Sequence, residues 1–408
     1  MMTPESAVNV NSPLRFALIK PGNCIREARL SLHLPVEGYL YDSGESVTGA
    51  AIKASQAAGA RLHVISRALQ NAEETIAGMR FIEILAFAPS ISLLAQRFLK
   101  FWAELRILPR LSAFQPHLMV CIGPGYLLLI PWLYAIISGS TFVPLMVDSF
   151  SITYKKGFAA RLHHAITRLV LRSAKTQRIL SYSHYIKSEI EQEGISKEKT
   201  LVFSQVYEDR FFCPPSESEP SRTVSSPKIL FVGRLDLQQK GLDFLIEIAR
   251  SVVSAHPEVV FEIIGEGSDR QALEDLISQN HLQANFQILG YRPQDQLLTH
   301  MQAAHLMVIP SRHEGLAKVG LEAVFASLPL VAFDCGGVRD YLRDQHNGFL
   351  IPRFDTVLFA RRVNDLLEDA SLRQTMQQNA WQVANEFRQP QYPLADAFLD
   401  LLTQQTGS

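Results

Sequence analysis

The feature that most restricts how this chain can fold is a long stretch without any charged residue, residues 119–147. On length alone it could span a bilayer. Three prolines and three glycines divide it, however, into a short apolar run, a helix-like run and a second short apolar run. That division is typical of a strand, a helix and a strand in a buried parallel sheet. We therefore predict an α/β core here, with a membrane span as the disfavoured alternative.

Other segments repeat this strand and helix alternation. Residues 14–20 predict a first strand, and residues 42–66 predict a glycine loop, a helix and a second strand. Residues 176–203 predict a strand, a helix and a strand. The connection between the first two units, from Pro21 to about Tyr41, is expected to be a long loop, and loops of that length are more often functional than accidental. The chain thus predicts Rossmann-like units.

Two carboxylates flank a predicted junction between a loop and a helix in residues 310–337. Residues 306–310 predict a buried strand, Glu314 follows on the loop, and Glu322 lies early in a helix that ends before Pro329. The start of a helix attracts a diphosphate, and nearby carboxylates accept hydrogen bonds from sugar hydroxyls. This arrangement suits a nucleotide-sugar site. The alternative is an ordinary loop acid followed by an acid at a helix start.

Two cations follow an earlier predicted strand, residues 228–234, which ends with Arg234. Ligands of open parallel sheets bind outside the carboxyl ends of strands, so Arg234 and the nearby Lys240 are candidates to bind phosphate. The alternative is that both are solvated surface cations. Gly265 and Gly267 are expected to turn the next strand into a helix and to bring backbone close to a nucleotide.

These three blocks resemble the donor-site signature of the retaining glycosyltransferases of family 4. They read FVGRLDLQQKGLDFLI, FEIIGEGSDRQAL and PSRHEGLAKVGLEAVFASLPLVAFDCGG, in the family's order. The resemblance implies the GT-B architecture, an α/β fold in which two Rossmann-like domains face each other across a cleft. It implies transfer of a sugar from a UDP- or GDP-sugar to a hydroxyl acceptor with retention, without a metal or another cofactor.

The resemblance also implies which residues form the site. Arg234 and Lys240 would stabilise the diphosphate, Glu314 the sugar hydroxyls and Glu322 the ribose. Asp148 stands about where relatives carry a histidine; it could orient the acceptor hydroxyl or cap a turn. The catalytic set is Arg234, Lys240, Glu314 and Asp148, and the donor-binding set is Gly44, Gly233, Arg234, Lys240, Gly265, Gly267, Tyr291, Glu314, Gly315, Leu316, Ala317, Lys318, Val319, Leu321 and Glu322.

The length of 408 residues favours two domains. We expect an acceptor-side domain in residues 1–205 and a linker in 206–227, which contains a Pro- and Ser-rich stretch. A donor domain is expected in residues 228–385. Residues 386–408 are expected to hold a last helix, which in this fold can cross back to the first domain.

Composition restricts the partners. The net charge of −1 argues against a nucleic-acid binder. The four cysteines lie far apart, which indicates neither a zinc site nor a disulfide framework. The first residues do not resemble a signal peptide, so the cytoplasm is the simplest location.

A basic segment, residues 155–187, could contact an anionic membrane from the inner face. Its apolar positions follow helical spacing, so the favoured alternative is a core-facing stripe with a solvated basic edge. Residues 92–105 could add to such a surface. The eight cations of this segment, with no acid between Asp148 and Glu189, are Lys155, Lys156, Arg161, Arg168, Arg172, Lys175, Arg178 and Lys187.

The expected function is sugar transfer to a glycan or lipid-linked acceptor, in cell-envelope or exopolysaccharide synthesis. Two alternatives use the same fold: a nucleotide-sugar epimerase or phosphorylase, and a non-catalytic sugar-nucleotide-binding module. A hydride-transferring enzyme is disfavoured because no G-x-G-x-x-G motif follows the first strand.

Overall fold

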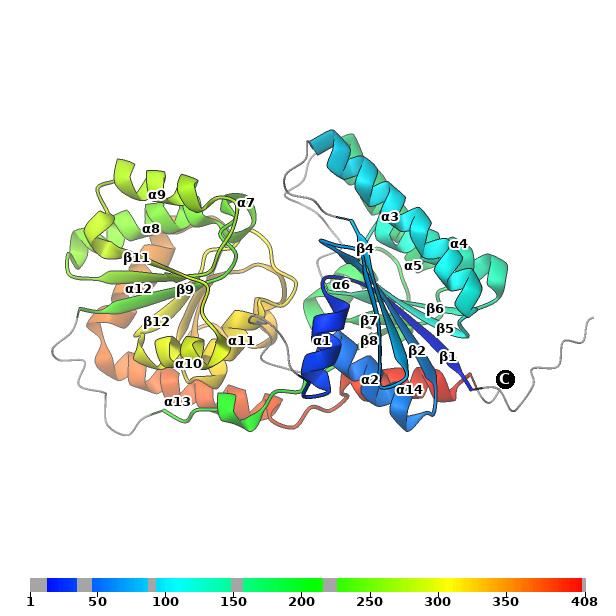
Figure 1. Ribbon diagram of the computed structural model, residues 1–408. Coiled ribbons are helices and arrows are strands. Elements are labelled where there is room, and N and C mark those ends of the chain that lie inside the picture. Colours follow the sequence, from blue (N-terminus) through cyan, green and yellow to red (C-terminus); the bar gives the residue numbers. More distant parts are fainter. Residues whose placement is uncertain (1–12, 35–45, 87–92, 148–156, 216–225, 406–408) are drawn as a thin grey trace, which may run out of the picture.

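The computed structural model describes residues 13–34, 46–86, 93–147, 157–215 and 226–405. They form two α/β domains side by side, each built around its own parallel sheet (Figure 1). The predicted fold class, two Rossmann-like domains in the GT-B arrangement, is confirmed.

The first sheet runs in the order β3-β4-β2-β1-β5-β6-β7-β8 and is parallel except for β3. The chain extends from β1 to one side of the sheet and then, starting with β5, to the other. Such a reversal leaves a crevice at the carboxyl ends of the two central strands. The strands are β1 (Arg15–Pro21), β2 (Arg61–Ala68), β3 (Ala72–Ile76), β4 (Met79–Leu85), β5 (Leu118–Ile122), β6 (Thr141–Met146), β7 (Ile179–Ser181) and β8 (Thr200–Val202).

Helices cover both faces of this sheet, which explains why its central strands β1, β5 and β6 are buried along nearly their whole length. On β1, Phe16 and Leu18 enter one core while Ala17 and Ile19 enter the other. Helices α1 and α2 lie on the first of these faces, and α3 to α6 lie on the second. Their bounds are α1 (Cys24–Ser31), α2 (Val47–Ala57), α3 (Leu93–Phe114), α4 (Tyr126–Ser138), α5 (Phe158–Arg172) and α6 (His184–Gln192), with the 3-10 turn η1 (Lys197–Lys199).

The uncharged stretch forms β5, α4 and β6, as its prolines and glycines predicted. Helix α4 begins after Gly125 and ends at Gly139, which adopts the left-handed conformation typical of a helix end. Across the described residues, no helix combines the length and the hydrophobicity that crossing a membrane requires.

The expected long loop after β1 was wrong in part, because it contains α1. The Asn23 side chain caps this helix by accepting a hydrogen bond of 2.8 Å from the Arg26 backbone. Only Cys24 and Ala28 of α1 are buried.

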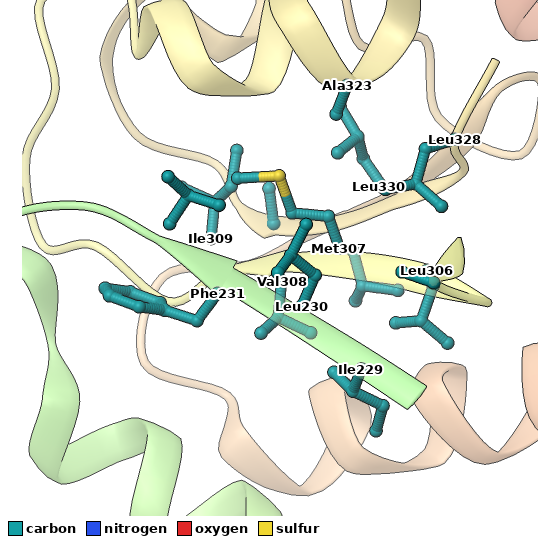
Figure 2. Packing of buried hydrophobic residues seen from close by; sticks show 14 of the residues in the cluster. Ile229, Leu230, Phe231, Leu306, Met307, Val308, Ile309, Ala323, Leu328 and Leu330 are labelled. Atoms are coloured by element: carbon teal, nitrogen blue, oxygen red, sulfur yellow. The ribbon is translucent and has the colours of Figure 1, made fainter. Parts of the chain in front are cut away.

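The second sheet is parallel throughout and runs in the order β11-β10-β9-β12-β13-β14, so its reversal lies between β9 and β12. Figure 2 shows the apolar side chains of these two strands packed together with Ala323, Leu328 and Leu330. The strands are β9 (Lys228–Val232), β10 (Val260–Ile264), β11 (Phe286–Gly290), β12 (Leu306–Ile309), β13 (Leu330–Phe333) and β14 (Gly348–Ile351).

Helices again flank the sheet. The predicted helices after β10 and β12 are confirmed as α9 and α11, and α8 follows β9. The short α7 was not predicted. The helices are α7 (Leu237–Lys240), α8 (Leu242–Ala255), α9 (Arg270–Gln279), α10 (Gln294–Ala303), α11 (Lys318–Phe325), α12 (Thr356–Glu368) and α13 (Ala370–Phe387), and the 3-10 turns are η2 (Asp209–Phe211), η3 (Gln283–Asn285) and η4 (Gly336–Asp340).

The chain passes between the domains twice. Phe203 belongs to the first core and Tyr207 to the second, so the first passage lies between them. The return passage follows α13, and α14 (Leu394–Thr403) then packs on the first domain, where Phe398 meets Phe16 edge to face at 5.5 Å. The two passages run side by side, because the Ser204 N–H donates to the Tyr392 carbonyl at 2.7 Å.

The favoured interpretation of the basic segment, a core-facing apolar stripe, was wrong in part for α5, because Ile166 and Val170 pack on the core but the leucines of the stripe do not. Leu162 and Leu169 are 50% and 54% exposed, while Thr167, Val170 and Leu171 are the residues that pack inward. The side of α5 that packs on the sheet is thus rotated away from the side that carries Leu162 and Leu169.

Candidate active site

A cavity of about 650 Å³ lies between the two domains. Both of its walls lie where the chain order of a sheet reverses, at the ends of β1 and β5 and at the ends of β9 and β12. The first domain contributes Lys20, Pro21, Glu27, Ser46, Val47, Ile122, Val147, Tyr182 and Gln205, and the second contributes Gly233, Arg234, Gln239, Lys240, Glu314, Gly315, Leu316, Ala317, Lys318 and Val319.

An ion pair between Lys240 and Glu314 forms the centre of the second wall. The Lys240 Nζ lies 2.7 Å from the Glu314 Oε1, which also accepts a hydrogen bond of 2.6 Å from the Ser311 hydroxyl. Both side chains are largely buried, with 15% and 7% exposed. The pair links the end of α7 to the loop after β12, so the two sequence blocks meet in space.

Gly241 makes this approach of the two loops possible. It has a positive φ of 64°, and a Cβ at this position would lie 2.0 Å from the Pro310 carbonyl oxygen. No other residue fits there without moving one loop. Gly241 therefore sets the distance between Lys240 and Glu314.

Arg234 is the exposed cation of this wall, with 60% of its side chain accessible. Its guanidinium contacts the Gln239 side chain and lies 3.9 Å from the Asp236 carboxylate. A guanidinium presents a fork of donors, so the remaining N–H groups can bind an anion in the cavity.

The loop from Glu314 to Val319 lines the cavity and is held by contacts to the rest of the second domain. Ala317 has a positive φ of 56°, and the Tyr341 hydroxyl donates to its carbonyl at 2.9 Å. Burial raises the pKa of Tyr341 well above its usual value, so this hydroxyl stays protonated and remains a donor. Gly336 packs so closely that a Cβ would lie 1.7 Å from the Glu314 carbonyl oxygen.

The loop leads into the N-terminus of α11, and Lys318 and Val319 line the cavity there. Helix starts carry unpaired N–H groups and a partial positive charge. With Arg234 and Lys240 nearby, the second wall is suited to an anion such as a diphosphate.

Five predicted donor-site residues do not line this cavity within the described part of the chain. Glu322 and Leu321 lie on α11, at its fifth and fourth positions, and are 5% and 2% exposed. Gly265 and Gly267 instead let loops pack, since a Cβ would lie 1.8 Å from the Gly233 carbonyl oxygen and 2.2 Å from that of Leu235. Tyr291 follows β11, at the edge of the sheet.

Two further predicted residues, Gly44 and Asp148, lie outside the described residues. No metal-binding group of three or more His, Cys, Asp or Glu side chains occurs in the described ranges.

Sequence reasoning missed the charged residues of the first wall, Lys20 and Glu27. Lys20 could have been found, because it ends a strand that was predicted, and strand ends of parallel sheets bind ligands. Glu27 could not, because it lies on α1, which was not predicted.

Residues 216–383 match the family model of the glycosyl transferases group 1. The alpha-D-kanosaminyltransferase of Streptomyces kanamyceticus is 28% identical over 273 residues, which cover 64% of this chain and 70% of that enzyme. Alignments with several other curated glycosyltransferases cover between 34% and 56% of those proteins.

Two solved structures have the same fold over nearly the whole chain. WaaG, a glycosyltransferase involved in lipopolysaccharide biosynthesis, aligns with a TM-score of 0.68 at 18% identity, covering 96% of this chain and 99% of WaaG. HepE of Anabaena, in complex with UDP and glucose, aligns with a TM-score of 0.66 at 16% identity, covering 97% and 100%. At such identities the likeness shows the fold alone.

The two domains and the cavity between them thus define the GT-B fold, and residues 216–383 of the second domain match the family model of the glycosyl transferases group 1. The protein is a glycosyltransferase.

Proposed function

We propose that this enzyme moves a sugar, with retention, from a nucleoside-diphosphate sugar to a hydroxyl of a glycan or lipid-linked acceptor. The observation that carries the proposal is the Lys240–Glu314 pair, at 2.7 Å, on the cavity wall beside Arg234. Cations and a carboxylate are there placed side by side, as a ligand with both phosphates and sugar hydroxyls requires. HepE, which shares the fold, contains UDP and glucose.

In this proposal Arg234 and Lys240 stabilise the negative charge that develops on the leaving diphosphate. Glu314 accepts hydrogen bonds from the transferred sugar, and Glu322 contacts the ribose after a rearrangement of the α11 start. No metal or other cofactor is needed, because the two cations and the N-terminus of α11 supply the positive charge. Closure of the domains would exclude water and limit hydrolysis.

The donor is tested by thermal shift with UDP, GDP and ADP, followed by incubation with the sugar nucleotide that stabilises the fold most. A transferase consumes this donor without inorganic phosphate, and the anomeric configuration of the product, read by NMR, tests retention. An epimerase would leave the donor mass unchanged, a phosphorylase would require phosphate, and a non-catalytic binding module would leave the donor intact.

Helices α3, α4 and α5 lie side by side (Figure 1), and we name their outer surface the three-helix face. A lipid-linked acceptor agrees with the apolar and basic residues of these helices. The sequences of these helices contain four Lys or Arg on α3 and three on α5, against one acid, Glu104. That acid is buried in an ion pair with Arg67. The exposed large hydrophobic residues of these helices are Phe101, Trp102, Tyr126, Leu133, Ile136, Ile137, Leu162 and Leu169.

We propose that the three-helix face contacts the anionic inner face of a membrane, from the cytoplasm. Apolar side chains enter the interface while the surrounding cations bind lipid phosphates. In this position the enzyme would take its acceptor from the bilayer, in cell-envelope or exopolysaccharide synthesis. WaaG is involved in lipopolysaccharide biosynthesis.

A further inference from the structure

A second ion pair, between Lys20 and Glu27, lies on the first wall of the cavity. The Lys20 Nζ is 2.5 Å from the Glu27 Oε1, and the other carboxylate oxygen accepts a hydrogen bond of 2.6 Å from the Thr48 hydroxyl. Lys20 is 5% exposed and Thr48 is fully buried. The pair is therefore fixed in place from two sides.

Three elements bring these groups together. Lys20 lies at the carboxyl end of β1, Glu27 lies in the first turn of α1, and Thr48 lies in the first turn of α2. Gly22, with a φ of 93°, turns the chain between the first two. The Asn23 cap then starts α1 so that Glu27 reaches back to Lys20.

A comparison within the same sheet separates this pair from a structural ion pair. Arg67 and Glu104 are equally close, at 2.5 Å, and more deeply buried, but neither lines the cavity in the described part of the chain. Lys20 and Glu27 border open volume. An ammonium has three donors and a carboxylate about four acceptor sites, so both groups keep capacity for a ligand after pairing with each other.

We propose that Lys20 and Glu27 bind the acceptor next to its reacting hydroxyl. Glu27 accepts a hydrogen bond from a neighbouring hydroxyl, and Lys20 donates to an adjacent oxygen. The acceptor is thus a polyhydroxylated ring, such as a sugar, with oxygens on adjacent carbons. The two residues position this ring and take no proton from it.

This inference rests on the proposed function, because it assumes that the donor occupies the second wall. The family match covers residues 216–383, which leaves the first wall outside the matched domain. The two Lys–Glu pairs then divide the cavity between the two substrates.

The test compares Glu27→Gln and Lys20→Met with wild type. Transfer is measured to the p-nitrophenyl hexoside that wild type uses fastest among the glucosides, galactosides, mannosides and N-acetylglucosaminides. Loss of a charged hydrogen bond is expected to raise the acceptor KM about 10- to 100-fold. The dissociation constant for the nucleoside diphosphate, measured by calorimetry, is expected to stay within about twofold of wild type.

Glu104→Gln is the matched control, because it weakens a buried ion pair away from the cavity. It should lower the melting temperature and leave both substrate KM values unchanged. Glu27→Asp should recover part of the acceptor affinity. Should Lys20→Met fail to fold, the nearly isosteric Glu27→Gln still gives the measurement.

Two results would overturn the inference. An unchanged acceptor KM in folded Glu27→Gln would show that the pair is only structural, and a raised donor KM with an unchanged acceptor KM would assign it to the donor. Failure of the proposed function would look different, since wild type itself would then neither bind the nucleoside diphosphate nor consume the donor.

Discussion

The two walls of the cleft are built alike and charged differently. Each lies at the reversal of a parallel sheet, and each carries a Lys–Glu pair. On the second wall Arg234 and the start of α11 add positive charge to the pair, whereas on the first wall Lys20 and Glu27 neutralise each other. The difference indicates an anion on one side and neutral hydroxyls on the other, which is what sugar transfer from a diphosphate requires.

The largest expected effect comes from removing the exposed cation of the second wall. Arg234→Ala should reduce kcat by about 10²- to 10³-fold, because one donor to the developing charge is lost. Its side chain is 60% exposed, so the melting temperature should hardly change. Steady-state kinetics and thermal unfolding of the same preparation measure both. Arg234→Lys keeps the charge but loses the forked guanidinium, so its kcat should lie between those of wild type and Arg234→Ala.

The next effect tests how the second wall is assembled. Gly241→Ala places a Cβ 2.0 Å from the Pro310 carbonyl oxygen and should separate Lys240 from Glu314, with a loss of activity of tenfold or more. Gly59→Ala is the control. Gly59 has a similar φ of 61° but no atom within 4 Å, so its substitution costs only the backbone strain of about 1–2 kcal/mol. Equal activities of the two variants would contradict the role given to Gly241.

A smaller effect concerns the membrane rather than the cleft. Leu162→Ser with Leu169→Ser should weaken binding to vesicles of phosphatidylglycerol and phosphatidylcholine about tenfold or more, since each exposed Leu contributes apolar area to the interface. Vesicle co-sedimentation measures this. Leu69→Ser is the control, because Leu69 is 70% exposed but lies outside the three-helix face. If the double variant bound vesicles as tightly as wild type, the three-helix face would not be the membrane-binding surface.

The smallest effect concerns a contact between the two domains outside the cavity lining. The Asp340 carboxylate of η4 accepts a hydrogen bond of 2.7 Å from the His184 N–H at the start of α6. Burial raises the pKa of the Asp340 carboxyl group, so this group binds its proton more tightly in the folded protein than in the unfolded chain. The contribution of Asp340 to stability therefore decreases as the pH rises above its ordinary value of 3.8.

Asp340→Asn should remove that dependence while keeping an oxygen acceptor for the His184 N–H. Thermal unfolding from about pH 4 to 7 should show wild type falling relative to the variant, by roughly one to two degrees. If the melting temperatures of the two proteins changed with pH in parallel, ionisation of Asp340 would not lower the stability of the fold.

The second wall could be predicted from sequence because its residues follow strands directly. Arg234 comes two residues after β9, and Glu314 five residues after β12, so the strand pattern alone placed them at one edge of a sheet. Glu322 was predicted from the same block, but its position one helical turn further in takes it behind the wall.

The first wall could not be predicted in the same way. Glu27 reaches Lys20 from α1, a helix that was not predicted, and Thr48 of α2 in turn donates to Glu27. The orientation of α5 was equally hidden, since its buried face includes Thr167 while Leu162 and Leu169 face outward. Tertiary packing decides such cases over local pattern.

The most direct test of the account is the affinity of the two walls for a nucleoside diphosphate alone. Calorimetry with UDP, GDP and ADP should show binding of at least one of them to wild type and to Glu27→Gln alike. The same nucleotide should bind Arg234→Ala at least tenfold more weakly. Wild-type affinity in Arg234→Ala, or loss of affinity in Glu27→Gln instead, would contradict the assignment of the diphosphate to the second wall.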